Sequence, residues 1–272
     1  MDTLLKTELL NTAREAALKA GEIHLKYYGK KKHINHKINE FDLVTNVDRE
    51  SEDIIIDTIS KSFPNHSYLA EEAHHIDNTS DFQWVIDPLD GTTNYAHNFP
   101  QFCVSIGLIY QGELRLGVVY DALKKEFFHA IKGEGAFLNN KSIEVSTVKT
   151  LSASLLSTGF PYDRSDKKTN NLNYFERFVY KTQGIRRPGA AALDLCYLAC
   201  GRYDGFWELG LAPWDTAAGT VIVREAGGIV TNFFSNTYDI FQQNIIASNK
   251  YIYDEMSQII KETSPVVPVQ NK

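Results

Sequence analysis

The sequence lacks any apolar run long enough for a secretion signal or a membrane span. Charged side chains interrupt the first 29 residues throughout. No later stretch comes close to the roughly 20 consecutive apolar residues that a spanning helix needs. We therefore expect a cytoplasmic protein with no membrane partner.

Cysteine is scarce, and the few cysteines do not form the pattern of a disulfide framework. There are three among 272 residues, at Cys103, Cys196 and Cys200. We expect all three to be reduced and buried, because free cysteine is mostly an interior residue. None of the eight histidines stands at zinc-ligand spacing from a cysteine, which argues against a zinc enzyme.

Motifs of two other enzyme classes are also missing. The chain contains neither the GxxxxGKS/T loop of nucleotide-binding proteins nor the GxSxG elbow of serine hydrolases. Its formal charge of -6 disfavours a nucleic-acid-binding surface spread over the whole protein, although a local basic patch stays compatible with it. The simplest interpretation is a mildly acidic protein that uses a cationic cofactor.

The chain does contain enough apolar residues for a sizeable core, since 43% of its residues are hydrophobic. Apolar positions recur at helical spacing over residues 5–27. A second helix is predicted from Thr45, which with Asp48 has the spacing of a capping box, to Pro64. Both helices should pack one face against a sheet.

Short β-prone runs begin at residue 67 and indicate a meander of antiparallel strands. They lie at 67–70, 83–86, 103–110, 114–121 and 125–131. After residue 150 strands and helices alternate, which predicts sheets covered by helices on both sides. The predicted strands are 152–158, 203–209 and 244–249, and the helices are 171–182, 188–201, 214–228 and a last one ending near 260.

The most informative segment is residues 84–95, WVIDPLDGTTNY. An apolar strand delivers Asp87 and Asp90 together, and Pro88 between them restricts the backbone, so both carboxylates and the Leu89 carbonyl could face one point. Such oxygen ligands suit magnesium. The alternative is a plain turn, because Asp, Pro and Gly are common turn residues.

An anion site is predicted directly after these carboxylates. Gly91, Thr92 and Thr93 offer consecutive backbone N–H groups and two hydroxyls, which suit a phosphate at the mouth of a turn. The metal and phosphate sites would then be adjacent.

Further carboxylates stand at the ends of other predicted elements. Glu71 and Glu72 follow the strand at 67–70, and Asp215 opens a helix. Dispersed carboxylates of this kind are what a two-metal phosphoryl-transfer site collects. Alternatively, Asp215 is only a favourable charge in a first helical turn, and Glu71 a solvated strand end.

The segments EE, DPLDGTTN and PWDTAAG, in this order, resemble the three signature motifs of the inositol monophosphatase family. The likeness extends to KINEFDLVTNVD, GEGAFLNN, RRPGAAALDL and GFWELGLAPWD, so it covers nearly the whole chain. It implies an α+β fold, the layered αβαβα sandwich of the inositol monophosphatase and fructose-1,6-bisphosphatase type. It also implies a lithium-sensitive enzyme that is a homodimer.

The resemblance implies a magnesium site of two or three ions. Its ligands would be Glu71, Asp87, the carbonyl of Leu89, Asp90 and Asp215, with Asp87 bridging two ions. Glu71 could also support a third ion through water, and so take part in catalysis.

The resemblance further implies that Thr92 and Asp48 orient the attacking water, while the N–H groups of Gly91 and Thr92 hold phosphate. Lys37 matches a lysine near the phosphate and metal. Asp48 can equally cap its own helix. Lys37 can equally be a solvated lysine of a basic loop.

The resemblance also implies that substrate contacts come from Asp90, Glu208 and the backbone around Ala190 and Ala191, an arrangement that suits a polyol. Relatives commonly have serine or threonine where this chain has Ala190, which leaves the fit to inositol open.

The predicted reaction is hydrolysis of a phosphate monoester, myo-inositol 1-phosphate first, by magnesium-activated water. Alternatives are a fructose-1,6-bisphosphatase, a 3'-phosphoadenosine 5'-phosphate nucleotidase and, from another class, a binding protein of the transcription machinery. We expect one phosphatase domain over 1–262, with a metal-binding half at about 1–145 and a substrate-shaping half at about 146–262. The tail at 263–272 carries prolines and no periodicity, which predicts disorder.

Overall fold

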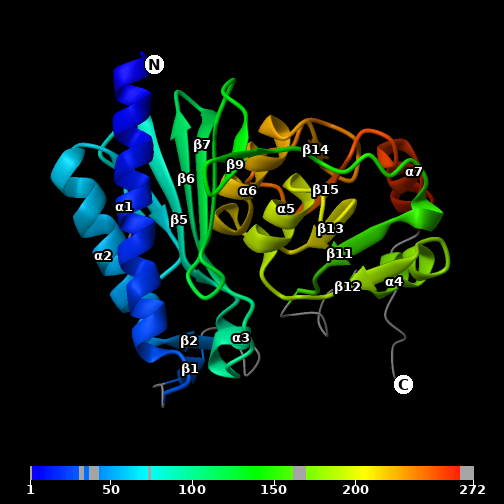
Figure 1. Cartoon of the computed structure of the whole chain (residues 1–272), viewed down its shortest axis with the longest axis horizontal. Coiled ribbons are helices and arrows are strands. Elements are labelled where there is room, and N and C mark those ends of the chain that lie inside the picture. Colours follow the sequence, from blue (N-terminus) through cyan, green and yellow to red (C-terminus); the bar gives the residue numbers. More distant parts are fainter. Residues whose placement is uncertain (1, 31–33, 37–42, 73–74, 162–169, 264–272) are drawn as a thin grey trace, which may run out of the picture.

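The computed structural model describes residues 2–30, 34–36, 43–72, 75–161 and 170–263. It arranges them in five layers of alternating helices and sheets (Figure 1). One helix pair covers the outer face of a large sheet, a second pair lies between the two sheets, and a third covers the outer face of the smaller sheet. In this order the pairs are α1 (Thr3–Tyr27) with α2 (Asn46–Ser62), α5 (Ala191–Ala199) with α6 (Pro213–Glu225), and α4 (Leu172–Val179) with α7 (Tyr253–Glu262). The predicted αβαβα sandwich is confirmed.

The larger sheet has eight strands, and its meander is antiparallel from β5 to β10 as predicted. The exception to the predicted pairing is β3, which runs parallel to β5. In spatial order the strands are β10 (Lys141–Ile143), β9 (Ala136–Leu138), β8 (Glu126–Ile131), β7 (Glu113–Asp121), β6 (Cys103–Tyr110), β5 (Phe82–Asp90), β3 (Ser67–Ala70) and β4 (His75–Ile76).

The smaller sheet has five strands and mixes parallel with antiparallel pairs. The strand predicted to begin at 152 begins only at 155, after a 3-10 turn. Strands β12 and β14, of three residues each, were too short to be predicted. In spatial order the strands are β12 (Gly184–Arg186), β11 (Leu155–Thr158), β13 (Gly205–Leu209), β15 (Asn244–Ser248) and β14 (Ile229–Thr231). A separate hairpin joins β1 (Ile34–His36) to β2 (Leu43–Thr45), and α3 (Thr92–Ala96) follows β5.

Helix α2 begins where the capping pattern predicted. The Thr45 hydroxyl accepts from the Val47 N–H at 3.1 Å, and the Asp48 carboxylate accepts from the Thr45 N–H at 2.8 Å. Such a cap is worth about 1 kcal/mol. Ile55 and Ile59 on the buried face pack against the sheet with α1. The cap therefore also places Asp48 at the end of a helix that is anchored on the sheet.

Helix α6 approaches the larger sheet unusually closely, because two glycines face it. Gly107 on β6 pairs with Gly117 on β7. A Cβ at Gly107 would lie 2.8 Å from the Ala217 Cβ, and one at Gly117 would overlap the Ala218 backbone. This close contact brings the first turn of α6, with Asp215, toward the sheet that carries the other carboxylates.

Two further findings concern the cysteines and membranes. Cys103 and Cys196 are buried and Cys200 is half-buried, and all three are free thiols. The prediction of burial is thus confirmed for two of them. Among the described residues, no helix combines the length and apolar character needed to cross a membrane.

Candidate active site

Asp87 and Asp90 lie at the end of β5, where the strand contains a β-bulge. Asp87 pairs with Ser105 of β6 and Asp90 with Cys103, so three steps along β5 match two along β6. Residues three apart in a regular strand point to opposite faces. The extra residue of the bulge restores both carboxylates to one face of the sheet. The predicted convergence of Asp87 and Asp90 therefore rests on a local irregularity of the strand.

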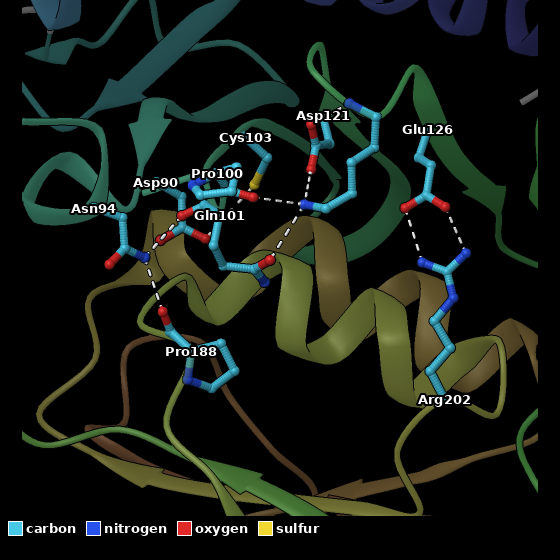
Figure 2. A network of polar contacts seen from close by, with 10 residues as sticks. Asp90, Asn94, Pro100, Gln101, Cys103, Asp121, Glu126, Pro188 and Arg202 are labelled. Atoms are coloured by element: carbon cyan, nitrogen blue, oxygen red, sulfur yellow. Dashed lines mark hydrogen bonds and ion pairs between the residues drawn. The ribbon is translucent and has the colours of Figure 1, made fainter. Parts of the chain in front are cut away.

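Asp90 is held from the other side by the start of α5. Its Oδ2 accepts from the Ala192 N–H at 2.8 Å. The same oxygen lies 3.6 Å from the sulfur of Cys103, which is drawn beside Asp90 in Figure 2. Burial raises the pKa of Asp90 to about 6, and the N–H groups of Ala192 and Ala191 oppose this rise. Asp90 thus connects the strand end of the larger sheet to the central helix layer.

Glu71 and Asp215 approach the same place from two other elements. Glu71 directly follows β3, and its N–H donates to the Ile86 carbonyl of β5 at 3.2 Å. Asp215 lies in the first turn of α6, where its Oδ2 accepts from the Ala212 N–H at 2.7 Å. Burial, followed by the charges of Glu71 and Asp90, raises the pKa of Asp215 well above its usual range.

Asp87 lies at the centre of this acid cluster, which we define as Glu71, Asp87, Asp90 and Asp215. Its side chain is 2% exposed. Burial raises its pKa well above the usual range, and the three neighbouring carboxylates raise it further. The four predicted acids are therefore close enough to repel one another, which is the electrostatic setting that a bound cation would relieve.

The donor atoms of the acid cluster suit a hard divalent cation, because every one of them is oxygen. Among the described residues, no three Asp, Glu, His or Cys side chains already stand in a metal-binding geometry. One oxygen each of Asp87, Asp90 and Asp215 accepts from a backbone N–H, at 3.0, 2.8 and 2.7 Å. A cation would thus bind mainly through the remaining oxygens, and the chemistry of the set fits magnesium.

Thr92 joins the acid cluster to the capped end of α2. Its hydroxyl lies 3.0 Å from Asp48 Oδ1 and 3.0 Å from the Leu89 carbonyl oxygen. Asp48 Oδ2 accepts from both the N–H and the hydroxyl of Thr45. Burial raises the pKa of Asp48 to about 6 against these bonds. Asp48 therefore serves as a helix cap and as a partner of Thr92 at once.

Gly91 shapes the turn predicted to hold phosphate. Its φ of +91° lies in the left-handed region, and a Cβ there would come within 2.8 Å of the Gln101 carbonyl oxygen. Only glycine combines this backbone conformation with the close approach. The turn places Thr92 at the start of α3, directly beside the acid cluster.

The predicted substrate residues Ala191 and Glu208 lie on α5 and β13. Both are buried, and Asp90 is close enough to each to take part in the same site. Burial raises the pKa of Glu208 to about 8, although the charge of Arg187 lowers it. The Glu208 side chain accepts no hydrogen bond from any described residue.

Asn94 ties the phosphate turn to the substrate side and was not among the predicted site residues. Its Nδ2 donates to Pro188 O at 2.8 Å and Gln101 O at 2.8 Å (Figure 2). It also donates to Gly189 O at 3.1 Å. The available signal was its position two residues after Thr92 in the same motif. Arg187, which acts on Glu208, was also missed, because its partner lies on a distant strand.

Two predictions lie outside the described residues. The first concerns Lys37, which is not among the described residues, so its proximity to phosphate stays a prediction. The same holds for the disorder expected over most of the tail at 263–272.

The fold agrees closely with that of solved phosphatases. A structure of inositol monophosphatase from Anabaena superposes with a TM-score of 0.88 at 44% identity and covers 97% of this chain and 98% of its own. The fold thus places the chain among the phosphatase hydrolases.

Sequence comparison gives the family. The model of the inositol monophosphatase family matches residues 5–265. An inositol-1-monophosphatase from Synechocystis is 47% identical over 93% of this chain and 89% of its own length. The Nus factor SuhB from Escherichia coli is 42% identical over 93% of this chain and 98% of its own. The chain belongs to the inositol monophosphatase family, as the motifs predicted.

Proposed function

We propose that this protein hydrolyses phosphate monoesters of small polyols with magnesium as cofactor, and that myo-inositol 1-phosphate is its best substrate. The observation that carries the proposal is the acid cluster at one end of β5, directly beside the Gly91 turn. Family membership and the similarity to a cyanobacterial inositol-1-monophosphatase support the substrate.

We assign the cation ligands to the acid cluster and the Leu89 carbonyl. Bound magnesium ions would supply charge stabilisation for the transferring phosphoryl group and a more acidic water. The chain itself contributes the positions of the carboxylates, which backbone N–H groups orient before any ligand arrives. Two ions fit the proposal, and a third would depend on Glu71.

Thr92 and Asp48 would hold the attacking water. The single hydroxyl proton of Thr92 is shared between Asp48 and the Leu89 carbonyl. The oxygen lone pairs of Thr92 are therefore left to accept a hydrogen from water. Asp48, with a pKa of about 6, is mostly ionised at neutral pH and keeps the hydroxyl in this orientation.

Substrate would bind with its phosphate on the N–H groups of Gly91 and Thr92 and its hydroxyls toward Glu208 and Ala191. Because its pKa is raised to about 8, Glu208 is mostly protonated at neutral pH. A protonated carboxyl can both donate to and accept from a sugar hydroxyl. This suits a polyol better than a second phosphate group.

The test is phosphate release from four substrates, with magnesium and with chelator instead. The panel is inositol 1-phosphate, glycerol 2-phosphate, fructose 1,6-bisphosphate and 3'-phosphoadenosine 5'-phosphate. We expect inositol 1-phosphate to give the highest kcat/KM, only with magnesium, and lithium to inhibit. A bisphosphate in first place would overturn the substrate and leave the metal site. No release from any substrate would overturn the phosphatase assignment.

A second candidate function is binding to the transcription machinery. It is favoured by 42% identity to a protein named Nus factor SuhB. The folded chain, tagged and added to cell extract, would then retain RNA polymerase in an RNase-sensitive manner. Absence of polymerase from the retained fraction would overturn this candidate without affecting the phosphatase.

The homodimer and the cytoplasmic location stay predictions. Exposed apolar side chains on and beside α4, such as Leu172 at 58% and Tyr180 at 82%, support a covered surface there. Light scattering of the purified protein should give twice the mass of 30.8 kDa.

A further inference from the structure

A cavity of about 490 Å³ lies away from the acid cluster, between the end of α6, the β6–β7 hairpin and residues 237–241. Its walls combine charged side chains with an apolar part that includes Ile109, Leu114, Ile240 and Phe241. Phe241 is 62% exposed, although it is a large apolar side chain. The volume is in the range of small-molecule sites, which are about 300–1,000 Å³.

This cavity is separate from the acid cluster. Arg224 lines it from the last turn of α6, whereas Asp215 lies in the first turn of the same helix. At 1.5 Å per residue the nine intervening steps correspond to roughly 13 Å along the helix axis. A group bound at Arg224 would therefore lie well away from the proposed metal ligands.

The charge of Arg224 has no carboxylate partner among the described residues. The side chain is half-buried, and its Nη2 donates to the Tyr238 carbonyl oxygen at 3.2 Å. Burial lowers the pKa of Arg224 because desolvation disfavours the charged form. A guanidinium has five N–H donors, so most of its capacity remains for an anion.

Three carboxylates also line the cavity, but each already has a partner. The contacts are Glu113 with Lys132 at 3.0 Å, Glu225 with the Gly135 N–H at 2.9 Å and Asp239 with the Phe241 N–H at 3.1 Å. None of the three carboxylates forms an ion pair with Arg224, so its positive charge stays available to a ligand.

We propose that this cavity binds a small organic oxyanion with a flat apolar body. Its carboxylate, phosphate or sulfonate pairs with Arg224, and its body packs against Ile240 and Phe241. A guanidinium matches the planar arrangement of such oxygens. A simple inorganic anion would contact Arg224 but not the apolar part of the walls. The proposal is independent of the phosphatase reaction.

The test is a fluorescence titration of the full chain with 8-anilinonaphthalene-1-sulfonate, which has both required parts. We expect saturable binding of one dye per chain. Arg224→Gln keeps a donor for the Tyr238 carbonyl and should weaken binding at least ~10-fold, as expected for loss of a charge-assisted hydrogen bond. N-phenyl-1-naphthylamine lacks the sulfonate, and it should bind the wild type as weakly as the sulfonated dye binds Arg224→Gln.

Two further variants keep the result interpretable. Thr237→Trp fills the cavity from an exposed loop position and should abolish dye binding even if Arg224→Gln does not fold. Lys61→Gln, on the exposed side of α2, removes one positive charge elsewhere and is the control; it should leave binding unchanged.

Three results would overturn the site. The first is that the dye does not bind to the wild type. The second is that Arg224→Gln and Thr237→Trp both bind the dye as tightly as the wild type does. The third is a changed affinity in Asp87→Asn, which would place the dye at the acid cluster.

Discussion

Carboxylates on the two sides of the site are held differently. Asp48, Asp87 and Asp90 of the larger sheet and its helices each accept a hydrogen bond from a backbone N–H. Glu208 of the smaller sheet accepts none from any described residue. Such bonds oppose the rise in pKa that burial causes at Asp48 and Asp90, whereas at Glu208 the charge of Arg187 opposes it.

The difference separates a preset part of the site from an adjustable one. Backbone N–H groups orient the metal-side carboxylates whenever the chain is folded. Substitution of neighbouring side chains should therefore change the orientation of these carboxylates little. The Glu208 carboxyl has no such hydrogen bond from the described residues, so we expect that its orientation can respond to the substrate. We therefore expect substitutions on the metal side to affect kcat, and those on the substrate side to affect KM or stability.

The largest effect is expected for Asp87→Asn, which removes the central charge of the acid cluster. Phosphate release should fall by on the order of 10³-fold, because a preset electrostatic contact is lost. The fold should persist, since an amide fills the same space, and circular dichroism checks this. Asp81→Asn, at the exposed residue directly before the same strand, is the matched control. A folded Asp87→Asn protein with near-normal activity would show that the metal assignment is wrong.

A smaller loss of activity is expected for Thr92→Val, which leaves Asp48 Oδ1 without its donor. We expect kcat to fall about 10- to 100-fold and stability by about 1–3 kcal/mol. In the wild type the hydrogen bond from Thr92 lowers the pKa of Asp48, so its loss should raise that pKa. The acid limb of the pH–rate profile should therefore move to higher pH.

Thr93→Val is a sharp control for this prediction. The Thr93 hydroxyl is buried and has no hydrogen-bond partner among the described residues, so its removal should leave stability unchanged or raise it. If both variants lose the same stability in a urea titration, the Thr92 contacts carry no special role.

Glu208→Gln tests the adjustable side through pH. The pKa of Glu208 is about 8 in the folded chain and 4.5 ordinarily, so the folded state holds a proton that the unfolded state releases. Stability from this group is therefore full below pH 4.5 and is lost as pH rises toward 8. Relative to wild type, Glu208→Gln should gain stability over this interval, by on the order of a few kcal/mol at pH 8.5.

Thermal melts of both proteins across this pH range measure that gain. Glu262→Gln on the exposed side of α7 should show no such trend. A constant difference between Glu208→Gln and wild type from pH 5 to 8.5 would contradict the raised pKa.

The smallest effect is expected for Asn94→Ala, which removes the link between the two sides (Figure 2). The Pro188–Gly189 turn should loosen, so KM should rise about 10-fold, equivalent to roughly 1.4 kcal/mol. The kcat should change little, because the acid cluster keeps its own hydrogen bonds. Asn236→Ala in a remote loop is the control. A fall in kcat at constant KM would place Asn94 on the metal side instead.

Local patterns in the sequence were enough to predict most elements. The site residues were predicted mainly through the resemblance of three motifs to a family. The capping pair at Thr45 and Asp48 and the strand at 103–110 depend on neighbours within a few residues, so they could be predicted correctly. The strands β12 and β14 could not, because three residues carry too little pattern and only pairing with β11 and β15 makes them strands.

The sequence by itself determined which residues are acidic and where each stands along its element. Only the tertiary structure decided that they meet. The bulge turns Asp90 to the face of Asp87, and the contact of α6 with Gly107 and Gly117 brings in Asp215. The raised pKa of Glu208 likewise follows from burial among distant segments. These properties depend on packing between residues far apart in the chain, which no local pattern contains.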